Sequence, residues 1–290
     1  MAIAGLTIIG ESINDSVPST KALFESGDIA GILELARSQD AAGAAYIDVN
    51  VGSRSPEFMA DLVVQIQQVT GKPLSIDTPD PAIAEAGLSA YRADLAGGGK
   101  PILNSITVAR ERMWELYAVQ PFRPILLATE LAGEGKLIPA RTAEQTYQAA
   151  KALAAAARTH CPGIANDDLI IDPGIAPLAG DTEGNLKRLI AAMERIHADP
   201  DLAGVHMSVG LSNFTVMLPS KRKDGMPVKS TLESAFLTIA MPRGLDMIIG
   251  SVKRKYELLP EEHPAMQCLR AVLQADGFEA LMHVRNFYAG

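Results

Sequence analysis

The sequence predicts an α/β protein built as a (β/α)8 barrel, and three observations lead to this fold class. Short apolar segments recur eight times along the chain, and stretches with amphipathic or alanine-rich helical character alternate with them. Eight such units in about 250 residues fit a closed barrel better than an open sheet. No glycine- and serine-rich linker or charge block divides the 290 residues, so we expect one domain over residues 1–290.

The expected strands are short aliphatic or β-branched runs, and most of them end in a polar residue. They lie at residues 6–9, 45–49, 74–76, 101–105, 124–128, 169–171, 204–209 and 246–249. Strands that alternate with helices form right-handed βαβ units, which place all the strands in one parallel sheet.

The expected helices fill the intervals between these strands. They lie at residues 29–42, 59–69, 82–95, 109–119, 143–159, 185–197, 231–241 and 264–287. Glycines that precede strands, such as Gly43 and residues 97–99, fit helix ends, because glycine adopts the left-handed conformation at little cost. The run 97–99 precedes a strand instead of leading from a strand into a helix, which argues against a phosphate-binding loop.

Composition and charge exclude several classes of protein. The chain is 48% hydrophobic and 21% charged, as is usual for soluble globular proteins. No apolar run reaches the roughly 18 to 20 residues of a membrane helix, and the first residues lack a basic leader, so we expect a cytoplasmic protein. A net charge of −8 argues against a protein that binds duplex nucleic acid. Cys161 and Cys268 lie far apart, which favours reduced thiols.

The candidate functional residues are the polar side chains at the ends of the expected strands. Catalytic groups of (β/α)8 barrels come from the carboxyl ends of the strands. In chain order these positions hold Glu11, Asn14, Asp48, Asn50, Asp77, Asn104, Ser105, Thr129, Glu130, Asp172, Ser212 and Asn213. Each residue alone could be a helix N-cap. Their occurrence on consecutive strands is harder to explain by capping.

This set of side chains is rich in amides and carboxylates. His206 lies inside an expected strand and is interpreted as a core histidine with its hydrogen bonds satisfied. The sequence has no His-Glu-x-x-His, Cys-x-x-Cys or Gly-x-Ser-x-Gly motif, so we expect no protein-bound metal. A ring of Asp and Asn suits a neutral ligand with N–H donors and ring-nitrogen acceptors, such as the 2-amino-4-oxopyrimidine of a pterin.

At these residues the chain resembles the pterin-binding methyltransferases. This family holds methyltetrahydrofolate:corrinoid/iron–sulfur protein methyltransferase and the folate-side methyltransferases of methylamine, glycine betaine and aryl ether demethylation systems, with dihydropteroate synthase as a more distant relative. The matching segments are Ile9-Gly10-Glu11-Ser12-Ile13-Asn14, Asp48-Val49-Asn50-Val51-Gly52, Ser75-Ile76-Asp77-Thr78, Asn104-Ser105, Ile171-Asp172-Pro173, Gly210-Leu211-Ser212-Asn213 and Gly244-Leu245-Asp246.

The resemblance implies a role for each matching residue. Asp77, Asn104 and Asp172 would hold the pyrimidine edge of the pterin, and Asn213 would hydrogen-bond N5, the atom that carries the methyl group. The remaining pterin contacts would come from Glu11, Asn14, Asp48, Asn50, Ser105, Gly210 and Ser212. We expect Asn213, with Asp77 and Asp172, to carry the catalysis. Because an amine leaves poorly, a group that stabilises the charge or proton developing at N5 favours the transition state.

The resemblance also implies substrates and partners. Tetrahydrofolate and 5-methyltetrahydrofolate would be the substrates, and a homodimer is expected. The chain has no Asp-x-His-x-x-Gly segment of the kind that ligates a corrinoid, so the corrinoid would arrive on a separate cobalamin-binding protein. Nothing in these residues selects the direction of methyl transfer.

The chain departs from the family pattern after Asn213. Relatives carry an arginine there, whereas this chain continues with an apolar stretch and then Lys221-Arg222-Lys223. Lys221 or Arg222 could replace that arginine and contact the glutamate tail of folate or an acidic corrinoid protein. The alternative is a solvated basic loop.

Two other functions remain open from the sequence. A dihydropteroate synthase would use the same pocket to displace pyrophosphate with p-aminobenzoate, and it should have a lysine on the seventh strand and a Ser-Arg-Lys anion site. The chain has Ser212 and Asn213 at the first position and Ser251-Val252-Lys253-Arg254 near the second, which matches only in part. A pterin-binding protein without catalytic activity is the other alternative.

Overall fold

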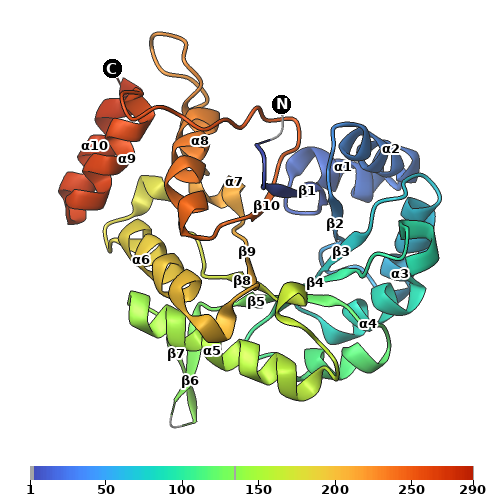
Figure 1. Ribbon diagram of the computed structural model, residues 1–290. Helices are drawn as coiled ribbons and strands as arrows, with labels where there is room; N and C mark the ends of the chain where they lie inside the picture. The colour runs from blue at the N-terminus through green and yellow to red at the C-terminus, as the bar shows by residue number, and fades with distance from the viewer. Residues whose placement is uncertain (1–2, 134, 290) are drawn as a thin grey trace.

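The computed structural model describes residues 3–133 and 135–289, and its main feature is a barrel of parallel strands surrounded by helices (Figure 1). The barrel strands are β1 (Thr7–Asn14), β2 (Tyr46–Asn50), β3 (Leu74–Asp77), β4 (Ile102–Ile106), β5 (Arg123–Leu127), β8 (Ile170–Asp172), β9 (His206–Met207) and β10 (Met247–Gly250). They are hydrogen-bonded in the order β10-β1-β2-β3-β4-β5-β8-β9. Every pair in this order is parallel.

The barrel is nearly closed between β9 and β10. Single parallel bridges join Met207 to Leu245 and Gly210 to Ile249. The Ile249 N–H donates to the Val209 carbonyl at 3.0 Å, beyond the end of the short strand β9. These contacts complete the circle, so the predicted (β/α)8 barrel is confirmed.

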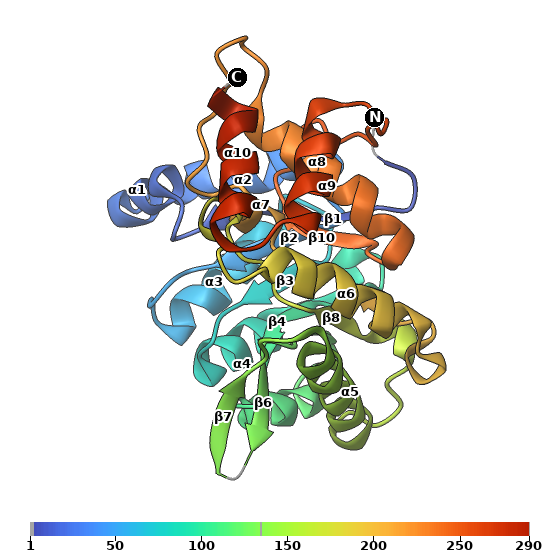
Figure 2. The same cartoon turned by 90° about the vertical axis from the view of Figure 1, so that its left-hand side faces the viewer.

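Helices form the outer layer of the barrel (Figures 1 and 2). They are α1 (Pro18–Ser26), α2 (Ile29–Ala41), α3 (Pro56–Gln67), α4 (Pro81–Ala90), α5 (Ala143–His160), α6 (Asn185–Ala198), α7 (Leu211–Phe214), α8 (Val228–Ala240), α9 (Pro264–Gln274) and α10 (Gly277–Ala289). Local sequence fixes several of their starts. The Ser55 side chain accepts from the Phe58 N–H before α3, and Thr142 forms a capping box with Gln145 before α5.

The apolar core has two parts. Ile9, Ile102, Ile125, Ile170 and Met247 form a small separate cluster, all of them buried. Because successive strand residues point to opposite faces, neighbours of this set pack outward into the larger cluster between strands and helices. We infer that the small cluster fills the barrel interior, where it forms a solid floor below the carboxyl ends of the strands.

The structure differs from the expected secondary structure in four respects. Residues 111–118 form a 3₁₀ helix instead of an α-helix. Their buried pairs Met113–Leu116 and Trp114–Tyr117 repeat every three residues, which suits a 3₁₀ helix as well as an α-helix. The expected helix 82–95 ends at Ala90, and a 3₁₀ turn follows. The expected helix 264–287 is two helices, separated at residues 275–276.

The fourth difference is a set of elements that the sequence did not predict. Helix α1 begins at Pro18 and is closed by Gly27 at a φ of 68°, a proline-start and glycine-end signal. An antiparallel hairpin, β6 (Glu130–Gly133) and β7 (Lys136–Pro139), follows β5 and projects from the barrel beside α5 (Figure 2). The one-turn helix α7 follows β9.

His206 lies at the first residue of β9, so it belongs to the amino end of the barrel and not to the end where the strand tips meet. Its Nδ1 lies 2.6 Å from Asp246 Oδ2 and its Nε2 lies 3.2 Å from Asp167 Oδ1. The bond to Asp246 raises the pKa of His206. The histidine is therefore hydrogen-bonded, as expected, but it is half-buried and does not lie in the core.

None of the helices in residues 3–133 and 135–289 is long and apolar enough to cross a membrane. Cys161 and Cys268 are both buried and do not form a disulfide with each other.

Candidate functional site

A cavity of about 570 Å³ opens at the carboxyl ends of the barrel strands. Its lining consists of Glu11, Asn14, Ser16, Val17, Asp48, Asp77, Asn104, Ser105, Leu127, Thr129, Asp172, Gly174, Ile175, Gly210, Ser212, Asn213, Val216 and Ile249. The structure thus brings together every candidate residue from the sequence except Asn50, Glu130, Lys221 and Arg222. Residues from most of the barrel strands contribute to one polar cavity.

Glu11 and Asn14 reach the cavity from β1 itself, which is longer than expected. The pairing of β1 with β2 is irregular between Gly10 and Ile13, and the Ser12 N–H there donates to Gln39 Oε1 at 2.8 Å. A Cβ at Gly10 would lie 2.6 Å from the same oxygen. Glycine is therefore needed at residue 10 to admit the buried glutamine that supports the irregular strand.

Asp48, which is buried, and Asp77, which is partly buried, form a pair of carboxyl groups in the cavity. Ser75 Oγ donates to Asp48 Oδ1 at 2.5 Å, and Asn104 Nδ2 donates to the same oxygen at 3.4 Å. Asn50 Nδ2 donates to Asp77 Oδ2 at 2.9 Å. Asn50 therefore acts behind Asp77 instead of lining the cavity, and it fixes the orientation of that carboxylate.

Burial raises the pKa of both carboxyls, and the charge of Asp77 raises the pKa of Asp48 further. Hydrogen bonds from Asn50 and Asp48 oppose the rise in the pKa of Asp77. Asp48 consequently holds a proton more readily than Asp77 does. Of the two carboxyls, Asp77 is therefore the one that more readily carries the negative charge.

Asp172, the last residue of β8, is a second buried acceptor. Its Oδ1 accepts the Gly174 N–H at 2.8 Å. Burial raises the pKa of Asp172 to about 6, although this bond and the charge of Arg188 oppose the rise. The group is therefore ionised at neutral pH but can take up a proton in mildly acidic solution.

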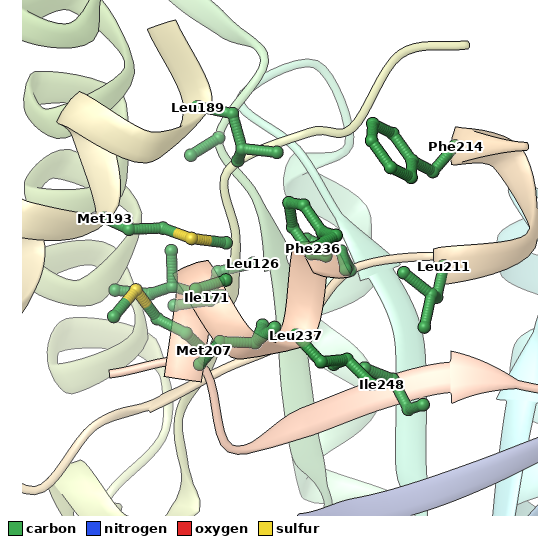
Figure 3. Close-up of a cluster of buried hydrophobic side chains, with 14 of the residues drawn as sticks. Leu126, Ile171, Leu189, Met193, Met207, Leu211, Phe214, Phe236, Leu237 and Ile248 are labelled. Carbon is green, nitrogen blue, oxygen red and sulfur yellow. The ribbon is translucent and has the colours of Figure 1, made fainter. Parts of the chain in front are cut away.

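Asn213 lines the cavity from α7, a single helical turn that is fixed by apolar packing on one face and by a hydrogen bond on the other. Leu211 and Phe214 are buried below it, and the rings of Phe214 and Phe236 lie 5.1 Å apart (Figure 3). On the other side Ser212 Oγ donates to Glu11. The exposed side chain of Asn213 is thus presented by a fixed turn.

The absence of a side chain at Gly210 leaves space for the amide group of Asn213. A Cβ at residue 210 would lie 2.9 Å from Asn213 Nδ2, closer than real Cβ atoms approach. The backbone at Gly210 has a φ of −73°, which other residues adopt easily. Space for Asn213, and not backbone strain, therefore requires glycine there.

A buried carboxylate lies beneath α7. Glu233 on α8 accepts hydrogen bonds from Thr215 Oγ1 at 2.5 Å and from Arg254. The charge of Arg254 also lowers the pKa of Glu11, whose pKa burial otherwise raises. Glu233 was not predicted from the sequence, and Arg254 was noted only within the segment that partly matches a Ser-Arg-Lys anion site, not as the partner of a buried carboxylate.

The two basic residues predicted for the site do not line the cavity. The guanidinium of Arg222 packs on the Phe287 ring at 4.9 Å from its centroid, and it pairs with Asp224 at 3.2 Å. Lys221 is exposed. A contact from either residue to a folate tail or a partner protein stays a prediction.

The chemistry of the lining suits a ligand with many N–H donors. Among the described residues that line the cavity, the charged side chains are all carboxylic acids. In the same ranges no group of three or more His, Cys, Asp or Glu is placed to hold a metal ion. Buried acceptors at the base and an amide at the mouth fit a 2-amino-4-oxopyrimidine ring better than an anion.

A sequence model of a family described as "Pterin binding enzyme" matches residues 13–250. The chain belongs to this family. Its matched segment runs from the last two residues of β1 to the end of β10, so it includes the other seven barrel strands, while Glu11 precedes it. The resemblance predicted from the strand tips is thereby confirmed.

A similar protein is the "Methylcorrinoid:tetrahydrofolate methyltransferase" of Eubacterium limosum. It is 28% identical to this chain over 259 residues, which cover 84% of each of the two chains. Similar solved structures are dihydropteroate synthases. The enzyme of Thermus thermophilus has a TM-score of 0.55 at 19% identity and covers 88% of this chain and 91% of its own. The enzyme of Vibrio fischeri has a TM-score of 0.55 at 17% identity and covers 99% of this chain and 93% of its own. At these identities the structures show a shared fold.

Proposed function

We propose that this pterin-binding enzyme transfers a methyl group between N5 of tetrahydrofolate and the cobalt of a corrinoid carried by a separate protein. The observation that carries the proposal is that the exposed side chain of Asn213 lines the same cavity as the carboxyls of Asp77 and Asp172. The name of the Eubacterium limosum relative supports this reaction and favours transfer from the methylcorrinoid to tetrahydrofolate.

The base of the cavity would bind the pyrimidine ring of the pterin. An ionised carboxylate at Asp77 or Asp172 accepts the 2-amino group and the adjacent ring N–H together. Asn104 can donate to a ring nitrogen or carbonyl with the amide proton that its contact with Asp48 leaves free. Because these side chains are buried, a ligand that left them unpaired would bind poorly.

Asn213 would act at N5, the reacting atom. In transfer to tetrahydrofolate, the N5 lone pair attacks the methyl carbon and the electron pair of the broken bond remains with cobalt. The amide oxygen of Asn213 can accept the N5–H hydrogen bond, which directs the lone pair outward and stabilises the positive charge that grows on N5. The proton of N5 then passes to water at the open mouth. In the reverse direction the same bond stabilises N5–H as it forms.

The dihydropteroate synthase alternative is less well supported by the lining of the cavity. That reaction releases pyrophosphate, and a developing polyanion requires fixed cations or N–H donors. The described residues that line this cavity include four carboxylic acids, Glu11, Asp48, Asp77 and Asp172, and neither lysine nor arginine. Such a lining opposes a polyanion, whereas it suits a neutral pterin ring.

The proposal is tested by methyl exchange in the absence of oxygen. One sample contains the protein with methylcobalamin and tetrahydrofolate, and the other contains Co(I) cobalamin and 5-methyltetrahydrofolate. The visible spectrum of the cobalamin reports transfer in each sample, and we expect transfer in both, faster toward tetrahydrofolate. If both spectra stayed constant while p-aminobenzoate and pterin pyrophosphate were condensed, the protein would be a synthase.

The remaining expectations concern partners. A separate cobalamin-binding protein as methyl carrier, a homodimer and a cytoplasmic location stay predictions. Replacing free cobalamin by a corrinoid protein from the same source in the exchange test should raise the rate, because the carrier supplies binding energy that free cobalamin lacks.

A further inference from the structure

A second cavity, of about 540 Å³, adjoins the first at the mouth of the barrel. The two cavities share the wall residues Thr129, Gly174 and Ile175. The rest of the second cavity is lined by Pro139, Ala140, Arg141, Ala176, Glu183, Asn185 and Arg188. These residues come from the end of the hairpin and from the segment around the start of α6. We call this second space the outer cavity.

The outer cavity differs from the inner one in charge. Its charged lining residues are Arg141, Arg188 and Glu183, whereas carboxylic acids alone supply the charged lining of the inner cavity within the described residues. A ligand that bridges both spaces would therefore place a donor-rich neutral end inside and an anionic end outside. Folates have this distribution, because a pterin is joined through an aminobenzoyl ring to a glutamate that carries two carboxylates.

Arg188 is fixed in place by its own hydrogen bonds. It donates to the Pro173 carbonyl at 2.9 Å, to the Gly174 carbonyl at 2.7 Å and to Thr146 Oγ1 at 2.8 Å. These bonds use three of the five N–H groups of its guanidinium and hold the loop after Asp172. Arg188 thus adds positive charge to the outer cavity while most of its donors serve the fold.

Arg141 is the less constrained of the two arginines that line the outer cavity. Its only described side-chain partner is Glu183, at 3.4 Å, and the two side chains are 69% and 68% exposed. An ion pair that is so exposed contributes little to stability, and water easily replaces either partner. A ligand carboxylate can therefore replace Glu183 and receive both parallel N–H groups of the guanidinium.

The hairpin places Arg141 at the shared wall. The Ala140 N–H donates to the Thr129 carbonyl at 2.8 Å, so the return strand ends beside the residue that separates the two cavities. On the other side the Arg141 N–H donates to Gln145 Oε1 at 2.9 Å, within the capping box of α5. The backbone of Arg141 is fixed from both directions, while its side chain is free to turn.

We propose, on the basis of the proposed function, that the outer cavity binds the aminobenzoyl-glutamate tail of folate and that Arg141 binds a carboxylate of this glutamate. Thr129 and Ile175 would contact the aminobenzoyl ring as it passes between the cavities. The proposal assigns the tail to the hairpin side of the barrel, whereas the sequence had predicted Lys221 or Arg222.

The test compares two ligands that differ in the tail. Dissociation constants are measured calorimetrically, without oxygen, for tetrahydrofolate and for 6-methyltetrahydropterin, which lacks the aminobenzoyl-glutamate group. Arg141→Ala should weaken tetrahydrofolate binding by roughly tenfold or more, as a lost hydrogen bond to a charged group does, and leave 6-methyltetrahydropterin binding unchanged. Lys221→Ala tests the rival site for the tail and should change neither constant if the tail binds Arg141.

Glu183→Gln should change tetrahydrofolate affinity in the opposite direction to Arg141→Ala. Removing the carboxylate that competes for Arg141 should strengthen tetrahydrofolate binding about two- to threefold, because an exposed pair of this kind is worth about 0.5 kcal/mol. A merely structural role of the pair would weaken binding in both variants. Opposite shifts in Arg141→Ala and Glu183→Gln support direct binding of the tail.

The outcomes separate this inference from the proposed function. If wild-type protein binds neither ligand, both the function and the outer-cavity proposal fail. If it binds both ligands but Arg141→Ala does not discriminate between them, only the assignment of the tail fails. A selective loss of tetrahydrofolate in Lys221→Ala would likewise overturn it and would place the tail at residues 221–223.

Discussion

Ser212 donates a hydrogen bond to the carboxylate of Glu11 across the barrel mouth, although 201 residues separate them in the chain. The bond joins α7 to β1, next to the gap in regular pairing between β9 and β10. Because Asn213 follows Ser212 directly, the position of its amide depends on this contact. The residue proposed to act at N5 is therefore located by a bond that the reaction itself does not use.

Asn213→Ala should impair chemistry more than binding. The proposed bond to N5 strengthens as charge develops on that atom, whereas the buried carboxylates supply the ground-state affinity. We expect the rate of methyl transfer to fall roughly 100-fold, the usual effect of losing one such preorganised group, with the dissociation constant of tetrahydrofolate changed by less than about threefold. Stopped-flow spectra of cobalamin and calorimetry measure the two quantities. An equal loss in both would make Asn213 a binding residue.

Gly210→Ala should displace Asn213 without unfolding the protein. The added methyl group would lie 2.9 Å from Asn213 Nδ2, and the flexible side chain can turn away. Since misplaced groups lose most of their catalytic effect, we expect the transfer rate to fall about tenfold or more and the free energy of unfolding to change by less than about 1 kcal/mol. Gly71→Ala is the control, because its Cβ would meet only Leu95 O, at 3.8 Å. Unchanged transfer in Gly210→Ala would contradict the role given to this contact.

The residues of the inner cavity were predictable because barrel geometry brings strand ends together wherever they occur in the chain. Asp48, Asp77 and Asp172 each follow a recognisable apolar run, and the rule that barrel sites form at carboxyl ends needs no further information. The same rule cannot say which way a side chain turns. Asn50 was therefore assigned to the ligand, whereas it donates to Asp77.

Residues that act through tertiary contacts were not predictable. Glu233 lies within an ordinary helical pattern, and only the fold shows that it meets Thr215 and Arg254. The hairpin at residues 130–139 did leave a signal, because Gly133 and Gly135 separate two short apolar pairs. Without the hairpin, nothing linked Arg141 to the barrel mouth.

Asp172→Asn should stabilise the free protein at neutral pH. Burial raises the pKa of Asp172 to about 6, above its ordinary value of 3.8, so the ionised form disfavours folding. The contribution of Asp172 to stability therefore falls as pH rises from 3.8 toward 6 and is then constant, whereas asparagine can keep the Gly174 bond without this cost. We expect the variant to exceed wild type by on the order of 2 kcal/mol at about pH 7.5 and by much less at about pH 4.5 in urea unfolding.

The same substitution should weaken pterin binding, because the amide presents only one acceptor oxygen where the carboxylate presents two. In wild type, 6-methyltetrahydropterin affinity should decrease as pH falls below about 6, when Asp172 takes up its proton. Asp172→Asn should lack this step. If the affinity of Asp172→Asn decreased at low pH in the same way as that of wild type, another group would be responsible for the decrease.

Arg254→Ala should destabilise the protein because it leaves a buried carboxylate unpaired. Glu233 is fully buried, and Arg254 is its charged partner. Removing one member of a buried pair costs about 3 kcal/mol, which urea unfolding at about pH 7.5 can measure. Arg92→Ala, which breaks the exposed pair with Asp94, is the control and should change stability by less than about 0.5 kcal/mol.

Two further results identify unpaired charge as the cause of the loss in Arg254→Ala. Burial already raises the pKa of Glu233, and loss of Arg254 would raise it further. The deficit should therefore shrink as pH falls, because the raised pKa lets the folded protein hold Glu233 in its neutral form at less cost. Adding Glu233→Gln to Arg254→Ala should recover part of the stability at neutral pH, because no charge is then buried. A deficit that is independent of pH and is not recovered would instead indicate lost packing of the Arg254 side chain beside α8.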